Sequence, residues 1–339
     1  MAVSNRVSGF MICSDFPVVY STLSAIAIME RVLPLYSLRK VERCELWNRG
    51  LSDIYFVQTT AGMMVLRISH HHWRSHTEVL FELDFLNFLK AQNLPVAAPI
   101  ATKTGELTVM IGAPEGMRYA TLFPFAPGGI AMGGWDEKQS YKLGEVVAQI
   151  HHVSQDFQTE QQRQPLDLSY LLDESMQFIL PFFGDRPQDL HFMEQTTEKI
   201  RSALIDFTRE EPLWTVCWGD AHSGNVHFTE DNQITLFDFD QCSYGWRAFE
   251  IGKFFQGALT TGMRRKVREA FLAGYESHTT FTPEEDAALQ SLTQLAYIWS
   301  WRISLENISL FSSSQLDRHY FTNRLERLKA LCSREWQLF

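Results

Sequence analysis

The sequence predicts an α+β protein of two lobes, a small antiparallel-sheet lobe at the N-terminus and a larger, mainly helical lobe at the C-terminus. Short apolar runs with strand-like alternation recur across residues 43–125. A stretch dense in glycine and proline follows at 126–134, and beyond it apolar residues recur mostly at helical spacing. We therefore expect lobes over 1–125 and 135–339, joined by a linker over 126–134.

The N-terminal lobe is expected to form a small sheet with one helix packed against it. In chain order the expected elements are a helix over 24–33, two strands within 43–68, a helix over 76–92, and three short strands, the last over 117–125. Ser75 and Glu78 have the spacing of a capping box, so the second helix should begin directly after Ser75.

The C-terminal lobe is expected to be helical apart from one strand-rich segment over 213–240. Helices are expected over 136–153, 169–181, 188–209, 262–277, 284–308 and 314–336. Inside the strand-rich segment, two strands over 226–229 and 234–239 should form a hairpin. A cleft between such lobes is a common place for a ligand.

Composition narrows the class of protein. The 339 residues carry a formal net charge of −10, which disfavours nucleic acid and anionic membranes as partners. Five scattered cysteines without a C-x-x-C pair indicate free thiols in a reducing compartment. No stretch approaches the roughly 18 apolar residues of a membrane span. We expect a cytoplasmic protein.

The predicted hairpin brings oxygen ligands together. If the turn over 230–233 closes tightly, Thr229 faces Ile234, and counting outward places Asn225 opposite Asp238. Opposed side chains in an antiparallel pair have Cβ atoms roughly 4.5–5.5 Å apart. An amide oxygen beside a carboxylate, with room for phosphates and water, suits Mg²⁺. Asp220 lies on the preceding loop.

Other readings of these residues exist. Asp and Asn beside Gly commonly only form turns. His222 and His227 together with Asp238 and Asp240 could instead indicate a metal-dependent hydrolase, although no H-E-x-x-H pattern is present. The absence of G-x-x-x-x-G-K-[ST] argues against a P-loop kinase.

The segments WGDAHSGN and LFDFDQCSYG resemble the signature of the aminoglycoside phosphotransferase and choline kinase family, H-G-D-x-x-x-x-N and then an apolar run ending in Asp. FELDFLNFLKAQNLPVAAP, LGEVVAQIHHV and FLAGYES are similar to further family segments, in the family's order, across most of residues 45–305. The most similar subgroup holds homoserine-kinase-like and bacterial stress-response kinases. The resemblance implies a protein-kinase-like two-lobe fold that uses ATP and Mg²⁺.

The resemblance also implies roles for single residues. Asp220 would be the catalytic base that accepts the proton of the attacking hydroxyl. Asn225 and Asp238 would bind the Mg²⁺ that bridges the ATP phosphates. Arg67, in VLRIS, would contact the phosphates, and Glu82 would pair with it. A surface strand charge and a solvated helix face are the alternatives for these two, with Glu78 as another partner.

Two further segments would complete the nucleotide site. RGLSD resembles the loop over the phosphates, where Ser52 could offer its hydroxyl and backbone N–H groups. The backbone around Pro124 and Ala126 would hold the adenine. Because Pro124 has no N–H, Ala126 should be the donor.

The sequence departs from the family at two positions. Trp218 replaces the His before Gly-Asp, and Glu250 replaces an Asp. Both positions chiefly support the catalytic loop, so we interpret them as subgroup variants. An inactive ATP-binding module is the alternative.

Only eleven residues separate Asp238 from Glu250, too few for the long segment on which protein kinases seat a peptide. A small-molecule acceptor with a hydroxyl is therefore favoured, such as an amino-alcohol, homoserine-like or aminoglycoside-like compound. A Ser/Thr protein kinase of the stress-response type is the alternative, with a protein as substrate.

Overall fold

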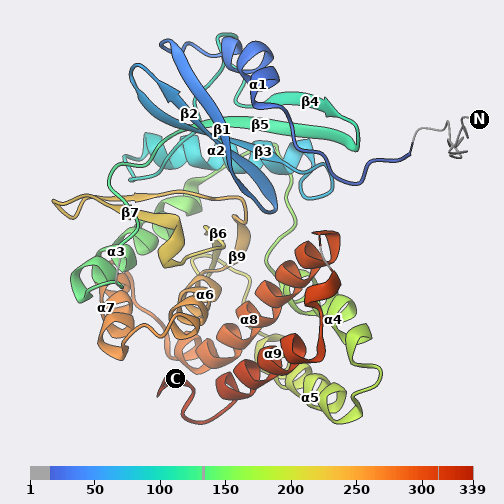
Figure 1. Cartoon of the computed structure of the whole chain (residues 1–339). Helices are drawn as coiled ribbons and strands as arrows, with labels where there is room; N and C mark the ends of the chain where they lie inside the picture. Colours follow the sequence, from blue (N-terminus) through green and yellow to red (C-terminus); the bar gives the residue numbers. More distant parts are fainter. Residues whose placement is uncertain (1–15, 132–133, 312, 339) are drawn as a thin grey trace, which may run out of the picture.

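The predicted arrangement of a sheet lobe followed by a helical lobe is confirmed (Figure 1). The structure is a computed structural model and describes residues 16–131, 134–311 and 313–338. Positions 1–15 of the predicted N-terminal lobe, 132–133 of the predicted linker, and 312 and 339 of the C-terminal lobe lie outside the described residues. The boundaries of the predicted lobes and linker remain our proposal.

The N-terminal lobe is built on a five-stranded antiparallel sheet with the order β1-β2-β3-β5-β4. The strands are β1 (Val41–Arg49), β2 (Ser52–Thr59), β3 (Gly62–Ser69), β4 (Val109–Ala113) and β5 (Gly116–Pro124). Two helices accompany them, α1 (Ala25–Arg31) and α2 (His76–Ala91). The capping box of Ser75 and Glu78 begins α2 as predicted.

The predicted strand order is wrong in one respect. Three strands precede α2 and two follow it, whereas the sequence suggested two and three. β1 is an edge strand whose residues are mostly exposed, with Cys44 its one buried position, so it lacks the apolar alternation that marks a strand. Ile100 and Thr102 form only isolated bridges, to Leu122 and Tyr36, instead of a strand of their own.

Two apolar cores hold the lobe. The smaller lies between α1 and the sheet and includes Ile28, Tyr55 and Leu66. The buried residues of α2, such as Leu83 and Phe85, belong instead to the large core of the helical lobe. Figure 1 shows α2 beneath the sheet, on the side of the helical lobe. This helix therefore couples the two lobes.

The C-terminal lobe surrounds two short hairpin-like sheets with helices. Its helices are α3 (Glu137–Val153), α4 (Glu174–Ile179), α5 (Pro187–Leu204), α6 (Arg247–Thr260), α7 (Arg265–Glu276), α8 (Pro283–Phe311) and α9 (Arg318–Leu331). The strands pair as β6 (Trp214–Cys217) with β9 (Ser243–Trp246), and β7 (Val226–Phe228) with β8 (Ile234–Leu236). A π-helical segment, Ser169–Asp173, precedes α4.

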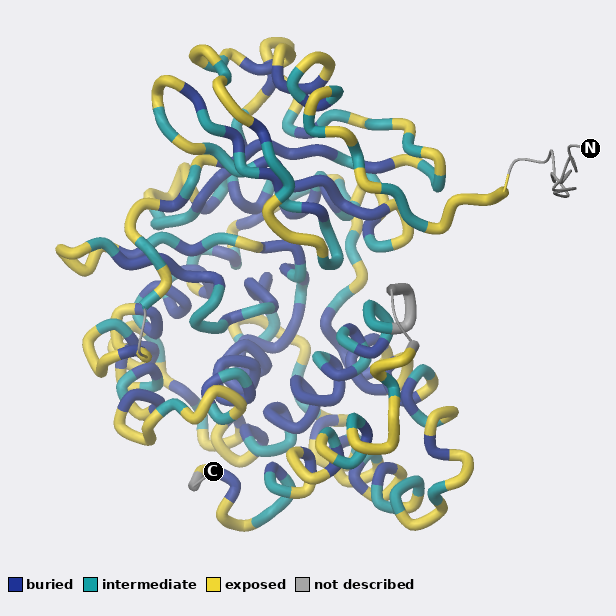
Figure 2. The backbone as a smooth tube through the Cα atoms, in the orientation of Figure 1, coloured by how far each residue is buried: buried dark blue, intermediate teal, exposed yellow. Residues whose placement is uncertain are grey.

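Helix α6 was not predicted from the sequence. Eleven of its fourteen residues are buried, and its polar residues Arg247, Glu250 and Lys253, spaced by three, face the protein instead of solvent. It packs against α8 so closely that a Cβ at Gly252 would lie 2.9 Å from the backbone of Leu292. Figure 2 shows both helices as largely buried in the middle of the lobe.

The helices α3 and α7 cross at two glycines. A Cβ at Gly144 would lie 2.0 Å from the carbonyl oxygen of Phe271, and one at Gly274 would lie 2.0 Å from that of Tyr141. No side chain fits at either position. The glycines of the LG and GY segments in the sequence are therefore explained by this close crossing.

Among the described residues, no helix combines the length and apolarity needed to cross a membrane.

Candidate active site

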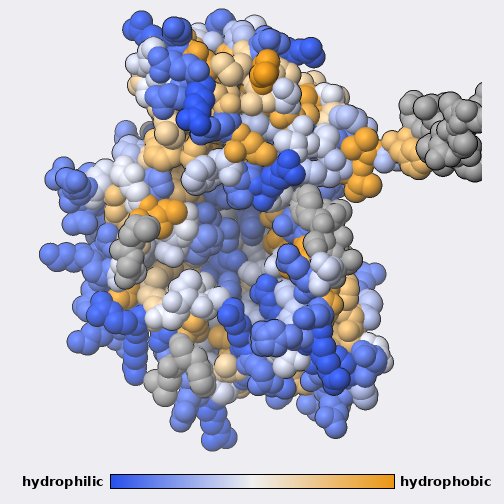
Figure 3. Space-filling model, in the orientation of Figure 1, coloured by the Kyte–Doolittle hydropathy of each residue, from blue (hydrophilic) through white to orange (hydrophobic). Residues whose placement is uncertain are grey.

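A sharp turn after β6 presents Asp220 to the space between the lobes. Gly219 has φ +85°, and a Cβ there would lie 2.2 Å from the carbonyl oxygen of Gln241, so only glycine fits. Figure 3 shows a hollow lined with hydrophilic residues between the two lobes. The turn thus places a carboxylate at a solvent-accessible cleft.

Three side chains hold the Asp220 carboxylate. Lys253 Nζ lies 3.1 Å from Oδ1, and Asn225 Nδ2 donates to Oδ2 over 3.1 Å. His222 Nδ1 accepts the Gly224 N–H, so the proton of the neutral ring is on Nε2, which lies 3.3 Å from Oδ2. Burial opposes ionisation, but Lys253 and His222 outweigh it and hold the Asp220 pKa well below its usual range.

The predicted hairpin register is wrong by one residue. Thr229 pairs with Gln233 instead of Ile234, because the loop has three residues and ends at Asn232 in the left-handed region with φ +57°. Asn225 consequently lies opposite Phe237, whose N–H donates to its carbonyl. Its side chain contacts Asp220 rather than Asp238.

Asp238 lies near Asp220 and Arg67 through an unusual backbone conformation of its own. Its backbone has φ +59°, an uncommon conformation for Asp, and its carboxylate lies 3.7 Å from Arg67 Nη1. The side chain is half exposed. The protein packed around it removes hydration and raises its pKa to about 7, and the carboxylates of Asp240 and Asp220 add to this against the effect of Arg67. A cation bound beside Asp238 would therefore favour the ionised form of its carboxylate.

Arg67 and Glu82 form the expected pair. Nη1 donates to Oε1 over 2.8 Å and Nη2 to Oε2 over 2.6 Å, a buried bidentate contact between β3 and α2. Burial would lower the pKa of Arg67, but Glu82 outweighs it and raises that pKa. Glu82 thus fixes the Arg67 side chain at the edge of the cleft.

Ser52, Pro124 and Ala126 lie at the ends of strands. Ser52 opens β2 and pairs with Ser69, two positions along β3 from Arg67. Pro124 ends β5, and Ala126 lies two residues beyond it. The Ala126 carbonyl accepts a bond from His227 Nδ1 over 2.8 Å, which ties this segment to β7.

The four side chains of the hydrolase alternative have separate partners. His227 contacts Ala126, and His222 contacts Asp220. Asp240 is buried against Arg74 and accepts a bond from the indole N–H of Trp73. They do not form one metal-binding set.

The two departures from the family pattern, Trp218 and Glu250, both hydrogen-bond to backbone groups near Asp220. Trp218 Nε1 donates to the carbonyl of Asp238 over 3.0 Å, and its ring stacks on Phe239. The two carboxylate oxygens of Glu250 accept the Gly219 N–H at 3.1 and 3.0 Å. His151, Cys217 and Glu250 place their ligand atoms within 4.8 Å of one another behind the loop, but Glu250 is already engaged by Gly219 and His151 Nδ1 by Tyr275.

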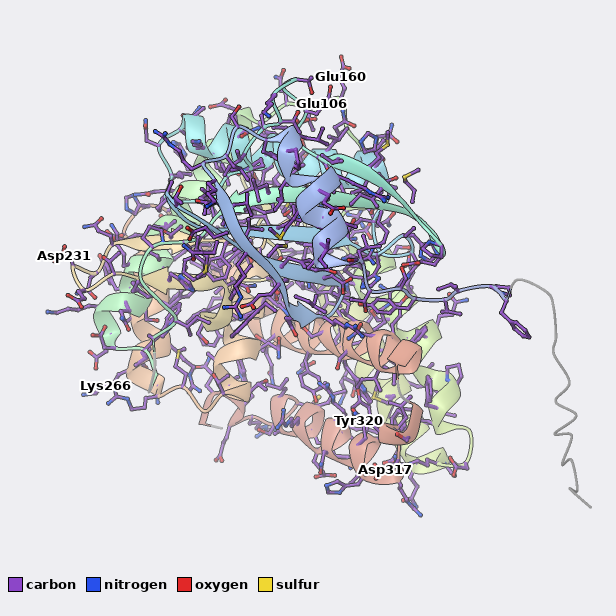
Figure 4. All side chains as sticks on the ribbon, turned by 45° about the horizontal axis from the view of Figure 1, so that its top comes forward. Glu106, Glu160, Asp231, Lys266, Asp317 and Tyr320 are labelled. Atoms are coloured by element: carbon purple, nitrogen blue, oxygen red, sulfur yellow. The ribbon has the colours of Figure 1, made fainter. Side chains whose placement is uncertain are left out.

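Glu250→Gln is expected to lower the free energy of unfolding by about 1–3 kcal/mol, because a buried hydrogen bond to a charged group is weakened. Turnover should fall more than nucleotide affinity, since the Gly219–Asp220 turn loosens. Denaturant unfolding together with kinetics checks this, with the exposed Glu160→Gln as control (Figure 4). Unchanged stability and turnover would show that Glu250 does not hold the loop.

Lys253 is the residue of the site that the sequence did not reveal. Lys253 lies on α6, which was not predicted. Without the helix, the spacing of three residues between Glu250 and Lys253 did not indicate that the two side chains share a face. Once 247–260 is seen to be helical, both side chains fall on one face, toward the loop.

A sequence model of the phosphotransferase enzyme family matches residues 44–289. The chain belongs to this family. The resemblance carried by WGDAHSGN and LFDFDQCSYG is thereby confirmed, and the catalytic-loop geometry above lies within the matched region.

Relatives and solved structures extend this match over nearly the whole chain. An uncharacterized protein of Synechocystis sp. is 48% identical over 324 residues, covering 96% of this chain and 90% of the relative. The structure of amicoumacin kinase hAmiN in complex with AMP-PNP, Ca²⁺ and Ami has a TM-score of 0.76 at 19% identity, covering 90% of this chain and 93% of that one. The microcompartment-associated aminopropanol kinase has a TM-score of 0.74 at 18% identity, covering 91% and 95%. The protein-kinase-like two-lobe fold is confirmed.

Proposed function

We propose that this phosphotransferase moves the γ-phosphate of ATP to a hydroxyl of a small-molecule acceptor, with Mg²⁺ as cofactor. The observation that carries the proposal is the proximity of two groups, since the charge of Asp220 acts on Asp238. One is Asp220 with Asn225, and the other is Asp238 with the Arg67–Glu82 pair. The family and the fold of ATP-using neighbours are consistent with it.

The donor set fits a hard divalent cation. Asp238 is a half-exposed carboxylate whose pKa is raised mainly because the surrounding protein removes hydration, and the carboxylates of Asp240 and Asp220 add to this. Asp238 and Asn225 would bind Mg²⁺ through oxygen, as this ion prefers. When bound, Mg²⁺ neutralises charge on the ATP phosphates.

Asp220 would act on the acceptor hydroxyl. Lys253 and His222 keep its carboxylate ionised, so it can accept a hydrogen bond that aims the hydroxyl oxygen at the γ-phosphorus. As the new O–P bond forms and the bond to ADP breaks, the hydroxyl proton passes to the carboxylate. Its lowered pKa makes Asp220 a weak base, which suits a loose transition state in which positioning dominates.

The N-terminal lobe would hold the nucleotide. Arg67, fixed by Glu82, would contact the phosphates, with Ser52 offering a hydroxyl near them. The Ala126 N–H would donate to the adenine, while its carbonyl is engaged by His227. Pro124 would line the same segment.

A small-molecule acceptor is favoured over a protein. The chain between Asp238 and Glu250 turns directly into β9 and α6, which leaves little room for a peptide platform. The solved neighbours are named for amicoumacin and aminopropanol, both small molecules. The Ser/Thr protein kinase alternative has no comparable support.

MgATP is expected to raise the melting temperature of the protein. At about 100 times its Kd a ligand adds about 2.7 kcal/mol to stability. Arg67→Lys keeps the charge but loses the bidentate pair with Glu82, so the shift should shrink. The exposed Arg43→Lys on β1 is the control. No shift of the unaltered protein at millimolar MgATP would refute nucleotide binding.

A further inference from the structure

A cavity of about 250 Å³ opens beside Asp220, on the side of the helical lobe. Its walls come from the loop around Asp220, from helix α6 and the turn after it, and from α8, and they combine polar side chains with apolar surface from Phe254, Ala258 and Met263. The residues around it are Asp220, His222, Lys253, Gln256, Thr260 and Ser300, with Ser223, Phe254, Thr261 and Met263 among the others. The volume lies just below the 300–1,000 Å³ of drug-sized pockets. A small acceptor fits it.

The fixed charges of this cavity cancel. Asp220 and Lys253 are the carboxylate and the ammonium that line it, and they lie 3.1 Å apart. Among the described residues around the cavity, Asp220 is the one carboxylate. An acceptor with an ammonium group would therefore compete with Lys253 for Asp220, or stay unpaired.

One part of the wall is a chain of hydrogen-bonded polar side chains that begins at Lys253. Lys253 Nζ donates to Ser300 Oγ over 2.6 Å, and Ser300 Oγ donates to Gln256 Oε1 over 3.3 Å. Gln256 Nε2 in turn donates to Thr260 Oγ1 over 3.2 Å. Hydroxyls and an amide can each donate and accept, which matches the hydroxyl groups of a polyol.

An anionic acceptor is also disfavoured. Lys253 is the cation that such a group would need, but its Nζ already contacts Asp220 and Ser300 and lies over the Trp299 ring, 5.6 Å from the centroid. An anion there would also face the carboxylate of Asp220 and the γ-phosphate.

We propose that Lys253 sets the acceptor class: the acceptor is a small uncharged polyhydroxyl compound, and amino-alcohols are selected against. This inference rests on the proposed function and names the substrate class of the same site. It runs against the amino-alcohol, homoserine-like or aminoglycoside-like acceptor expected from the sequence. The acceptor class is inferred from the charged groups that line the cavity, Asp220 and Lys253.

Matched acceptor sets test the proposal. One set is propane-1,2-diol, 1-amino-2-propanol and lactate, and another is glucose, glucosamine and glucuronate, which differ in charge at similar size. Binding is measured by calorimetry with MgADP present, and turnover with MgATP. The neutral member should exceed the others by about tenfold or more in kcat/KM or affinity in at least one set. Preference for the ammonium or carboxylate member in both sets would overturn the proposal.

Lys253→Met tests the role of the residue itself. Removing the ammonium frees Asp220, so the affinity ratio of the amine to the neutral member should rise about tenfold. Calorimetry with MgADP keeps this readable even if turnover is lost. Lys266→Met, on an exposed residue of α7 at the edge of the molecule (Figure 4), is the control and should leave the ratio unchanged. An unchanged ratio in Lys253→Met would overturn the assignment.

The proposed acceptor class and the proposed nucleotide-dependent function can be refuted separately. If MgADP binds but none of a panel of neutral polyols does, the acceptor class is wrong and nucleotide binding stands. If MgADP does not bind, the proposed function itself is wrong.

Discussion

Asp220→Asn is expected to reduce turnover by about two orders of magnitude or more and to leave nucleotide affinity close to that of the unaltered protein. Asn keeps the shape of the side chain and part of its alignment with Asn225 and His222. Asn lacks the negative charge that orients the acceptor hydroxyl, and it lacks the carboxylate oxygen that accepts the hydroxyl proton. Because Asp220 lines the acceptor cavity, nucleotide binding should depend on it little.

Asp231→Asn is a matched control for this variant. Asp231 is exposed at the tip of the β7–β8 hairpin and projects away from the molecule (Figure 4). Nucleotide titration and steady-state kinetics of both variants are compared. Full activity of Asp220→Asn would exclude Asp220 as the base, and joint loss of binding and activity would make it a structural or metal-binding residue.

Asp238→Asn is expected to raise the Mg²⁺ concentration for half-maximal activity by about tenfold or more. Loss of groups that merely support a metal ligand already costs about 10–100-fold, and Asp238 would be a ligand itself. The fold should stay intact, since the substitution removes a carboxylate whose charged form is disfavoured by loss of hydration and by Asp240 and Asp220, against the effect of Arg67. Melting temperature without metal is therefore expected to stay the same or rise.

Asp238 is also expected to make the affinity for Mg²⁺ depend on pH. With a pKa of about 7, Asp238 is mainly protonated below pH 7 and must lose that proton to bind Mg²⁺. The affinity for Mg²⁺ should therefore fall as pH drops below 7, towards about tenfold per pH unit, and level off above it. Asp238→Asn should lose this slope, and Asp231→Asn should keep it. A Mg²⁺ titration that is flat from pH 5 to 8 would contradict the assignment.

The parts of the fold that were predicted correctly are those whose sequence pattern lies within a few neighbouring residues. The start of α2 follows from Ser75 and Glu78, which interact within one helical turn. Asp220, Asn225 and Asp238 stand in two short segments whose residue pattern is itself the signal. The glycines at 144 and 274 were part of family segments, but their reason, a helix crossing, needed both helices in space.

The parts of the fold that the sequence did not predict depend on contacts made in space or on the conformation of a single loop residue. The spacing of three between Arg247, Glu250 and Lys253 in α6 was not recognised as helical because this polar face is buried, and Lys253 was missed with the helix. The hairpin register depended on one loop residue, Asn232 in the left-handed region, which shifted every pair by one. Asn225 therefore contacts Asp220, and Asp238 lies near Asp220 through its own positive φ.

Direct detection of a phosphorylated acceptor tests the central claim of phosphoryl transfer. The protein is incubated with MgATP and a pool of small hydroxylated compounds, and the phosphorus NMR spectrum is followed over time. The account predicts that the γ-phosphate signal is replaced by a phosphomonoester signal, and that this signal is absent with Asp220→Asn. ATP that stays intact, or yields inorganic phosphate alone with every acceptor, would contradict it.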